Sequence, residues 1–187
     1  MFSRYLHTRV SRTLLKKVGL ACALALWSVS QSYANPKSVT EISTKHQVMA
    51  GFLLQLPSYV TWPDKSGNAR ICLVGKDVFG SYIDQVLAAK IDKGAAQNIR
   101  IDRVADGQDV SHCHLAFFSE LPDTRYLAAQ RGVLLVGEQQ AFIDVGGMVN
   151  FYLERSRLRF EINLKTVTAQ GLKMSSQLLK LAKITGR

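Results

Sequence analysis

The sequence is poor in the residues and motifs on which most catalytic and metal sites depend. It contains 3 cysteines and 4 histidines among 187 residues. It has no G-x-G-x-x-G fingerprint, no Walker loop and no G-x-S-x-G nucleophile elbow. Internal repeats and low-complexity segments are also missing from the sequence. These absences exclude the common dinucleotide-binding, P-loop and α/β-hydrolase classes, and nothing in the sequence requires an enzyme.

Acidic residues are missing from the first 34 positions, which contain five Lys and Arg residues. An apolar run of about 12 residues follows these charges, at 18–29, and is too short to span a bilayer comfortably. Ser32, Tyr33 and Ala34 then form a small-x-small cleavage site. This order predicts a secretory signal peptide at 1–34 and one mature, exported domain at 35–187. An uncleaved N-terminal anchor is the alternative.

The signal peptide also contributes half of the apparent net charge. The whole chain has a formal net charge of +10, and without the five basic residues of the leader the charge is +5. This modest charge, without an Arg/aromatic motif, argues against a nucleic-acid partner. Attraction to anionic lipid headgroups or to an acidic partner protein stays open.

Two cysteines, Cys72 and Cys113, remain after the predicted cleavage, because Cys22 lies in the leader. An even pair in an exported protein favours a disulfide. The triplet His112-Cys113-His114 also fits a metal ligand set or an activated thiolate. Neighbours in an extended segment point to opposite sides, however, and no second Cys/His cluster exists. We therefore predict a disulfide, with no metal and no cofactor.

Short apolar strands alternate with helical segments in the first part of the mature chain. Strands are expected at 69–74, 98–104, 115–118 and 133–136, and helices at 39–59, 79–89, within 119–131, and at 139–145 and 165–184. Apolar strands without alternation are typical of parallel sheets covered on both faces. The sequence predicts an α/β fold: a three-layer α/β/α sandwich with a mixed sheet of about six strands, ending in a β-hairpin and a C-terminal helix.

The hairpin is expected at 146–164, where apolar and polar residues alternate on both sides of Arg155 and Ser156. A two-residue turn there brings the apolar rows of the two strands opposite each other, as Leu153 with Leu158, Phe151 with Phe160 and Val149 with Ile162. The other face pairs Asn150 with Glu161 and Tyr152 with Arg159. That face is either a solvated sheet face or a recognition surface. No pair of carboxylates for acid/base catalysis lies on it, because Asp144 and Glu154 lie elsewhere.

Two further features have structural and functional interpretations. Trp62 either packs the first helix onto the body or stacks on a ligand. The turn at 75–80 after the first buried strand, with Asp77 as the expected helix N-cap, permits a tight βα connection. Its backbone N–H groups also offer an anion site, and a ligand would bind at the strand ends near Gly75 and Ser119.

Several blocks of the sequence, in order over roughly residues 44–184, resemble the YfiR-like family of periplasmic proteins. The blocks are FL at 52–53, VTWP at 60–63, ICLVG at 71–75, DVFG at 77–80, CHLAFFS at 113–119, GGMVNF at 146–151, RFEINL at 159–164 and GLKMSSQLL at 171–179. Val78 departs from the pattern, because the family often has Pro at that place. The prototype's second cysteine pair has no counterpart in this sequence.

The resemblance implies a mixed-sheet α/β domain with a tendency to form homodimers. It implies a periplasmic regulator that binds the periplasmic sensor domain of an inner-membrane diguanylate cyclase and represses cyclic-di-GMP synthesis, and thereby biofilm formation. A structural disulfide is a family feature that Cys72 and Cys113 match. We expect the hairpin's polar face (Asn150, Tyr152, Arg159 and Glu161) and the adjoining final helix to bind the cyclase. The alternative function is a periplasmic sensor of a small molecule or cell-wall fragment.

Overall fold

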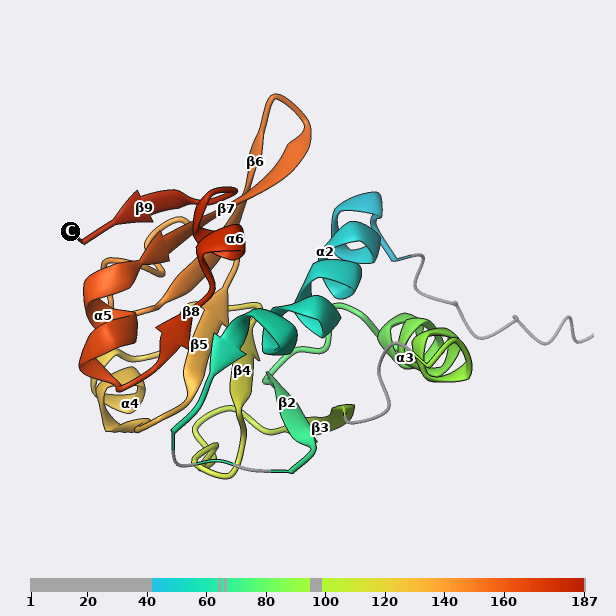
Figure 1. Cartoon of the computed structure of the whole chain (residues 1–187), viewed down its shortest axis with the longest axis horizontal. Helices are drawn as coiled ribbons and strands as arrows, with labels where there is room; N and C mark the ends of the chain where they lie inside the picture. Colours follow the sequence, from blue (N-terminus) through green and yellow to red (C-terminus); the bar gives the residue numbers. More distant parts are fainter. Residues whose placement is uncertain (1–41, 64, 66, 95–98, 187) are drawn as a thin grey trace, which may run out of the picture. The chain divides into compact units, whose positions relative to one another are not determined.

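The computed structural model describes residues 42–186 apart from 64, 66 and 95–98. The predicted signal peptide at 1–34 lies outside these residues. A seven-stranded mixed sheet forms the centre of the fold, in the order β3-β2-β4-β5-β6-β7-β9 (Figure 1). Its strands are β2 (Ala69–Val74), β3 (Ile99–Val104), β4 (Leu115–Phe118), β5 (Leu134–Gly137), β6 (Val149–Glu154), β7 (Arg157–Asn163) and β9 (Lys183–Thr185). The predicted α/β class is confirmed, with one strand more than expected.

Helices cover both faces of this sheet. Figure 1 shows α2 and α3 on one side, and α4 and α5 on the other. The helical segments are α2 (Thr44–Gln55), the 3-10 turn η1 (Leu56–Tyr59), α3 (Tyr82–Asp92), α4 (Thr124–Ala129), α5 (Leu164–Ala169) and α6 (Ser176–Leu179). Among the described residues, no helix combines the length and the hydropathy needed to cross a bilayer.

The central strands are buried because the helices cover both of their faces. All four residues of β4, all four of β5 and the last four of β2 are buried, so apolar side chains point to both faces. β3, β2, β4, β5 and β6 run parallel to one another, and β7 is antiparallel to β6. On one face, Phe52 of α2 packs on Phe151 and Phe160, with ring centroids 6.3 and 6.2 Å away.

The hairpin has the predicted register. Residues pair as Val149 with Ile162, Asn150 with Glu161, Phe151 with Phe160, Tyr152 with Arg159 and Leu153 with Leu158. Arg155 and Ser156 form the two-residue turn and have φ of 48° and 62°, as the twist-matched type I′ turn requires. The apolar row is not wholly in the core: the tip extends beyond α2 (Figure 1) and Leu153 is 54% exposed.

Ser156→Gly is expected to stabilise the protein by roughly 0.5–1 kcal/mol. The positive φ of this turn costs a non-glycine residue about 1–2 kcal/mol, and the larger backbone entropy of glycine in the unfolded chain cancels part of that gain. The matched control is Ser176→Gly, at an exposed position of α6. That change is expected to destabilise by roughly 0.5–1 kcal/mol, since glycine loses more backbone entropy in a helix. Urea unfolding of both variants measures the effect. A loss of stability in Ser156→Gly would contradict the turn assignment.

The C-terminal segment differs from the prediction. The expected helix at 165–184 is wrong: α5 ends at Ala169, and β8 (Lys173–Met174), α6 and β9 follow. Gly171 has φ of 75°, which ends the helix, and Met174 pairs with Val60 of β1 (Val60–Thr61). β9 then adds to the sheet beside β7, so the hairpin is not the last part of the sheet.

Two other helix predictions also change. Residues 139–145 form turns instead of a helix. The side chain of Phe142 is fully buried, and its carbonyl accepts a hydrogen bond from Gly147 N at 2.8 Å. α3 begins at Tyr82, and Asp77 is not its N-cap. The Asp77 carboxylate instead accepts hydrogen bonds from the N–H groups of Phe79 and Gly80 in the preceding turn.

Candidate functional site

A polar cavity lies where β5 ends, between the start of α2 and the polar face of the hairpin. It has a volume of about 440 Å³ and is lined by Lys45, Glu138, Gln140, Asn150, Tyr152, Leu153, Glu161 and Lys183. Three of the four predicted partner-binding residues, Asn150, Tyr152 and Glu161, therefore border one cavity. The fourth, Arg159, pairs with Tyr152 on the same face but lies outside the cavity lining.

Strand register places three polar groups in a row across this site. Asn150 of β6 pairs with Glu161 of β7, which pairs with Lys183 of β9. Glu161 accepts hydrogen bonds from Asn150 Nδ2 at 3.4 Å and from Lys183 Nζ at 3.1 Å. The hydrogen bond to Glu161 and then its charge raise the pKa of Lys183. Lys183, which the sequence assigned to a final helix, is thus the strand residue that completes the polar row.

Asn150 is the most buried polar residue of the cavity lining, at 1% exposure. Its Oδ1 atom is buried, and none of the described residues donates a hydrogen bond to it. An unpaired buried carbonyl oxygen costs about 1–3 kcal/mol. A donor in the cavity, from a water molecule or a ligand, would satisfy it.

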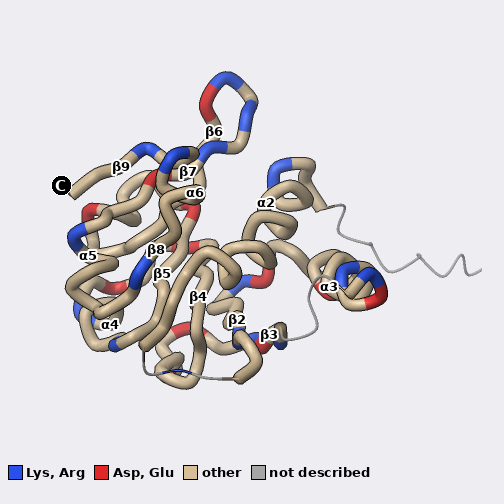
Figure 2. The backbone as a smooth tube through the Cα atoms, viewed as in Figure 1, with Lys and Arg blue, Asp and Glu red and all other residues tan. Residues whose placement is uncertain are grey.

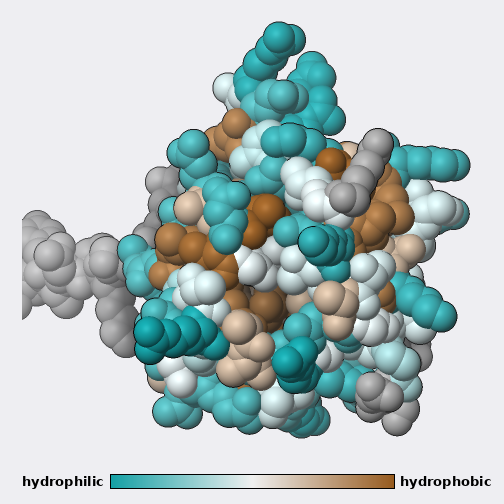
Figure 3. Space-filling view, turned by 90° about the vertical axis from the view of Figure 1, so that its left-hand side faces the viewer, coloured by the Kyte–Doolittle hydropathy of each residue, from teal (hydrophilic) through white to brown (hydrophobic). Residues whose placement is uncertain are grey.

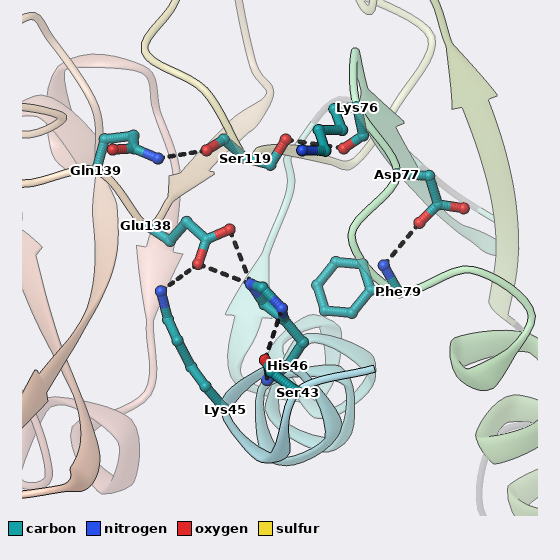
Figure 4. A network of polar contacts seen from close by, with 9 residues as sticks. All are labelled: Ser43, Lys45, His46, Lys76, Asp77, Phe79, Ser119, Glu138 and Gln139. Carbon is teal, nitrogen blue, oxygen red and sulfur yellow. Dashed lines mark hydrogen bonds and ion pairs between the residues drawn. The ribbon is translucent and has the colours of Figure 1, made fainter. Parts of the chain in front are cut away.

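A second polar network fixes α2 to the end of β5 (Figure 4). The Glu138 side chain is 5% exposed and pairs with Lys45 and with His46, whose Nε2 lies 3.0 Å from Glu138 Oε2. His46 Nδ1 lies 2.9 Å from the hydroxyl of Ser43 at the helix N-cap. Sequence reasoning missed Glu138, although its place directly after a buried strand was a usable signal.

The sequence suggested a ligand site at the strand ends near Gly75 and Ser119. In the structure, polar groups at these strand ends make hydrogen bonds within the protein. Ser119 Oγ donates to the carbonyl of Lys76 at 2.8 Å, and Gln139 donates to the carbonyl of Ser119 (Figure 4). The nearby Asp77 carboxylate accepts from two backbone N–H groups and from Arg103 Nε at 2.8 Å. The N–H groups of Phe79 and Gly80, which could otherwise bind an anion, are therefore already used by Asp77.

The hairpin tip offers a different surface from the cavity. Figure 2 shows both signs of charge along the tip, and Figure 3 shows it as hydrophilic at the top of the molecule. Arg159 and Glu154 are exposed here, and their Nε and Oε2 atoms are 3.6 Å apart. Strand alternation places Glu154 on the same face as Tyr152, so the expectation that Glu154 lies off the polar face is wrong. An exposed pair at this distance contributes little to stability, so both groups are free to bind another charged surface.

Cys72 and Cys113 form a disulfide that links the middle of β2 to the turn before β4. Their Cα atoms are 6.0 Å apart, and both residues are fully buried. His112 is exposed, and its Nε2 lies 3.7 Å from Cys72 Sγ. His114 lies on the other side, where its Nδ1 accepts a hydrogen bond from Arg70 N at 3.1 Å.

Trp62 packs edge-on against His114, with ring centroids 5.3 Å apart. The indole packs against the hydrophobic core, in keeping with the packing interpretation. It also borders a smaller cavity of about 300 Å³ beside Lys65 and Gln170. Burial, and then the charges of Lys65 and Arg70, lower the pKa of His114 below its ordinary value of 6.5.

The lowered pKa of His114 has a consequence for stability. As the pH falls, His114 binds a proton near pH 6.5 in the unfolded chain, but only at a lower pH in the folded protein. Protonation therefore favours the unfolded chain, and the stability that neutral His114 contributes above pH 6.5 is lost as the pH falls. We expect the free energy of unfolding to decrease from pH 7.5 to pH 5, and to decrease less in His114→Gln. Urea unfolding at the two pH values measures this. An identical decrease in the two proteins would exclude His114 as the cause.

Among the solved structures that this chain matches is a distant neighbour, an ABC domain in complex with L-Trp from Streptococcus pneumonia. It has 11% sequence identity and a TM-score of 0.47, and the match covers 73% of this chain and 60% of that chain. A match of this kind carries no argument about function. The sequence comparison is more specific: the model of the YfiR/HmsC-like family, DUF4154, matches residues 46–183. These residues include α2 from His46 onward, the disulfide, the hairpin and every residue of the cavity lining except Lys45. The chain belongs to the YfiR/HmsC-like family.

Proposed function

We propose that this protein is an exported regulator that binds the periplasmic domain of an inner-membrane diguanylate cyclase and holds cyclic-di-GMP synthesis low. The observation that carries the proposal is the family match over residues 46–183. The family acts by regulation rather than catalysis, and we assign no catalytic residue. In this proposal residues 1–34 direct export and are removed, and residues 35–187 form the periplasmic domain.

The buried disulfide supports the proposed compartment. Disulfides form and persist in oxidising environments such as the periplasm, and they are rare in the cytosol. Cys72 and Cys113 are paired and fully buried in a domain with enough length for a core. A buried bridge in this position fits a protein that works outside the cytoplasm.

The hairpin supplies the surface that we assign to the cyclase. Its polar face carries Asn150, Tyr152, Arg159 and Glu161. Its other face continues into an exposed apolar group, Phe52 and Leu153, at 39% and 54% exposure. Apolar side chains beside charged ones are typical of protein–protein recognition surfaces. A partner that binds around the hairpin tip would contact both its polar face and its apolar face.

Charge reversal tests this surface. Arg159→Glu and Glu161→Lys are expected to weaken binding of the cyclase domain by roughly 10- to 100-fold, because like charges then face the partner. Folding is expected to change little for Arg159→Glu, since this side chain is half-exposed. The matched control is Arg100→Glu, exposed on β3 at the opposite edge of the sheet, which should bind as the wild type does. Folded Arg159→Glu and Glu161→Lys variants that both bind normally would exclude the hairpin face.

The regulatory role has its own test in cells. Deleting the gene is expected to raise cyclic-di-GMP and biofilm formation, and deleting the partner cyclase as well should restore the low level. Complementation with Arg159→Glu should fail to repress, whereas Arg100→Glu should repress. Unchanged cyclic-di-GMP after deletion of the gene would contradict the proposed repression.

A second candidate function is sensing of a small molecule or cell-wall fragment. The unpaired, buried Oδ1 of Asn150 in the 440 Å³ cavity favours it. Soluble muropeptides are expected to raise the melting temperature of the wild type, and not that of Asn150→Leu, which keeps the size of the side chain. If no muropeptide raises the melting temperature of the wild type, this class of ligand is excluded.

A further inference from the structure

Three atoms that bind soft metals meet at the disulfide. The Sγ atoms of Cys72 and Cys113 and a ring nitrogen of His112 all lie within 4.8 Å of one another. The contact between Cys72 Sγ and His112 Nε2 is 3.7 Å. The sequence had argued against this arrangement, because His112 and Cys113 are neighbours. The structure brings them together because Cys113 lies in a turn before β4 and not in an extended strand.

These separations are close to those of a tetrahedral thiolate–imidazole site. With metal–sulfur and metal–nitrogen bonds of about 2.3 and 2.0 Å, neighbouring ligand atoms lie roughly 3.5–3.8 Å apart. Cys72 Sγ and His112 Nε2 already have this spacing. The two sulfur atoms are too close only because they are bonded to each other. Opening that bond lets the two sulfur atoms separate to the spacing that a metal site needs.

We propose that reduction of the Cys72–Cys113 disulfide creates a binding site for a thiophilic cation, Zn²⁺ or Cu⁺, held by the two sulfurs and by His112. The reductant is a dithiol or two thiols, which become a disulfide as the Cys72–Cys113 bond takes up two electrons and two protons. Each cysteine thiol then releases its proton to solvent when the cation binds. Water occupies the fourth position, on the exposed side of His112.

The surroundings keep the three ligands in place after reduction. Cys72 is held by the β2 ladder, where it pairs with Asp102 of β3 and Ala116 of β4. The Lys65 ammonium donates hydrogen bonds to the carbonyls of Ser111 and Cys113, on both sides of His112. His114 lies outside this cluster of ligand atoms, and its Nδ1 accepts a hydrogen bond from Arg70 N on the other side. The cation would thus bridge the strand and the turn that the disulfide joins.

The test uses the chain from Asn35, which contains every described element, in oxidised and reduced forms. Co²⁺, a spectroscopic substitute for Zn²⁺, is expected to give a thiolate charge-transfer band at one equivalent in the reduced chain only. His112→Ala should weaken the binding at least about tenfold, since even outer-shell partners of a metal are worth 10–100-fold. Ser111→Ala, which removes a neighbouring exposed side chain, should bind as the wild type does.

The melting temperature distinguishes cation binding by the folded protein from cation binding by the unfolded chain. ZnCl₂ is expected to raise the melting temperature of the reduced wild type, and less so that of reduced His112→Ala, because the cation binds the folded state. No charge-transfer band in the reduced wild type would overturn the proposal. Equal affinity in His112→Ala would overturn it too, as would a melting temperature that zinc leaves unchanged or lowers.

Discussion

Replacing Cys72 and Cys113 with alanine is expected to lower the free energy of unfolding by about 4 kcal/mol. The bridge closes a loop with a sequence separation of 41 residues, and the chain-entropy model assigns roughly this amount to a loop of that length. Both cysteines are fully buried, so their lost packing adds to the effect. In a domain of this size the melting temperature should fall by roughly 8–16 °C.

Urea unfolding followed by circular dichroism measures this effect, with the midpoint and slope fitted separately. The wild type in strong reductant is the natural comparison, and it should lose a similar stability if metal is kept out. Reductant should leave the double alanine variant unchanged, since that variant has no bond to open. A double variant within about 1 kcal/mol of the wild type would show that the disulfide does not stabilise the fold.

Gly147→Ala is expected to destabilise the protein by about 3 kcal/mol or more. A Cβ at Gly147 would overlap the ring of Phe142 and lie 2.6 Å from its backbone oxygen. Phe142 is fully buried and also lies against Gly137, so it has no free direction in which to move. Overpacking of a rigid core costs 1–3 kcal/mol, and a backbone clash adds to it. The turn that carries Glu138 and Gln140 to the cavity depends on this contact.

The matched control is Gly51→Ala, in the interior of α2. A Cβ there has nothing within 4 Å, and alanine is favoured over glycine in a helix by about 1 kcal/mol. The two substitutions are chemically identical, and their effects on the free energy of unfolding should have opposite signs. Thermal and urea unfolding of both variants measure them. A mild effect of Gly147→Ala, below about 1 kcal/mol, would contradict the packing described for Phe142.

The hairpin and the central strands were predictable because their signals are local. Two period-2 rows around Arg155 and Ser156 allow one register that puts apolar residues together, and the structure has that register. The last four residues of β2 and all of β4 are uninterrupted apolar runs, as burial on both faces requires. The α/β class follows from such segments without any knowledge of distant contacts.

The C-terminal segment was not predictable in the same way. Its apolar residues at Leu172, Leu178 and Leu179 fit a helix as well as they fit the observed pieces. What decides the structure is pairing with distant strands: Met174 with Val60 and Ile184 with Ile162. These partners lie far away in the sequence, so tertiary contacts override the local helical pattern.

The candidate site was predictable only where it depends on local sequence patterns. The polar row of the hairpin follows from strand alternation, so Asn150 and Glu161 were found. Glu138 and its partner His46 are 92 residues apart, and no local pattern joins them. Lys183 was placed on a helix, and its position beside Glu161 depends on the unexpected strand β9.

Binding of a cyclase is the central claim, and direct capture tests it most simply. The chain from Asn35 would be immobilised and exposed to the purified periplasmic domain of each membrane diguanylate cyclase of the host. Each capture would be run with and without reductant, and circular dichroism would confirm that the immobilised protein is folded. We expect specific capture of one cyclase domain by the oxidised protein. Failure of the folded protein to capture any of these domains, in either condition, would contradict the regulatory role.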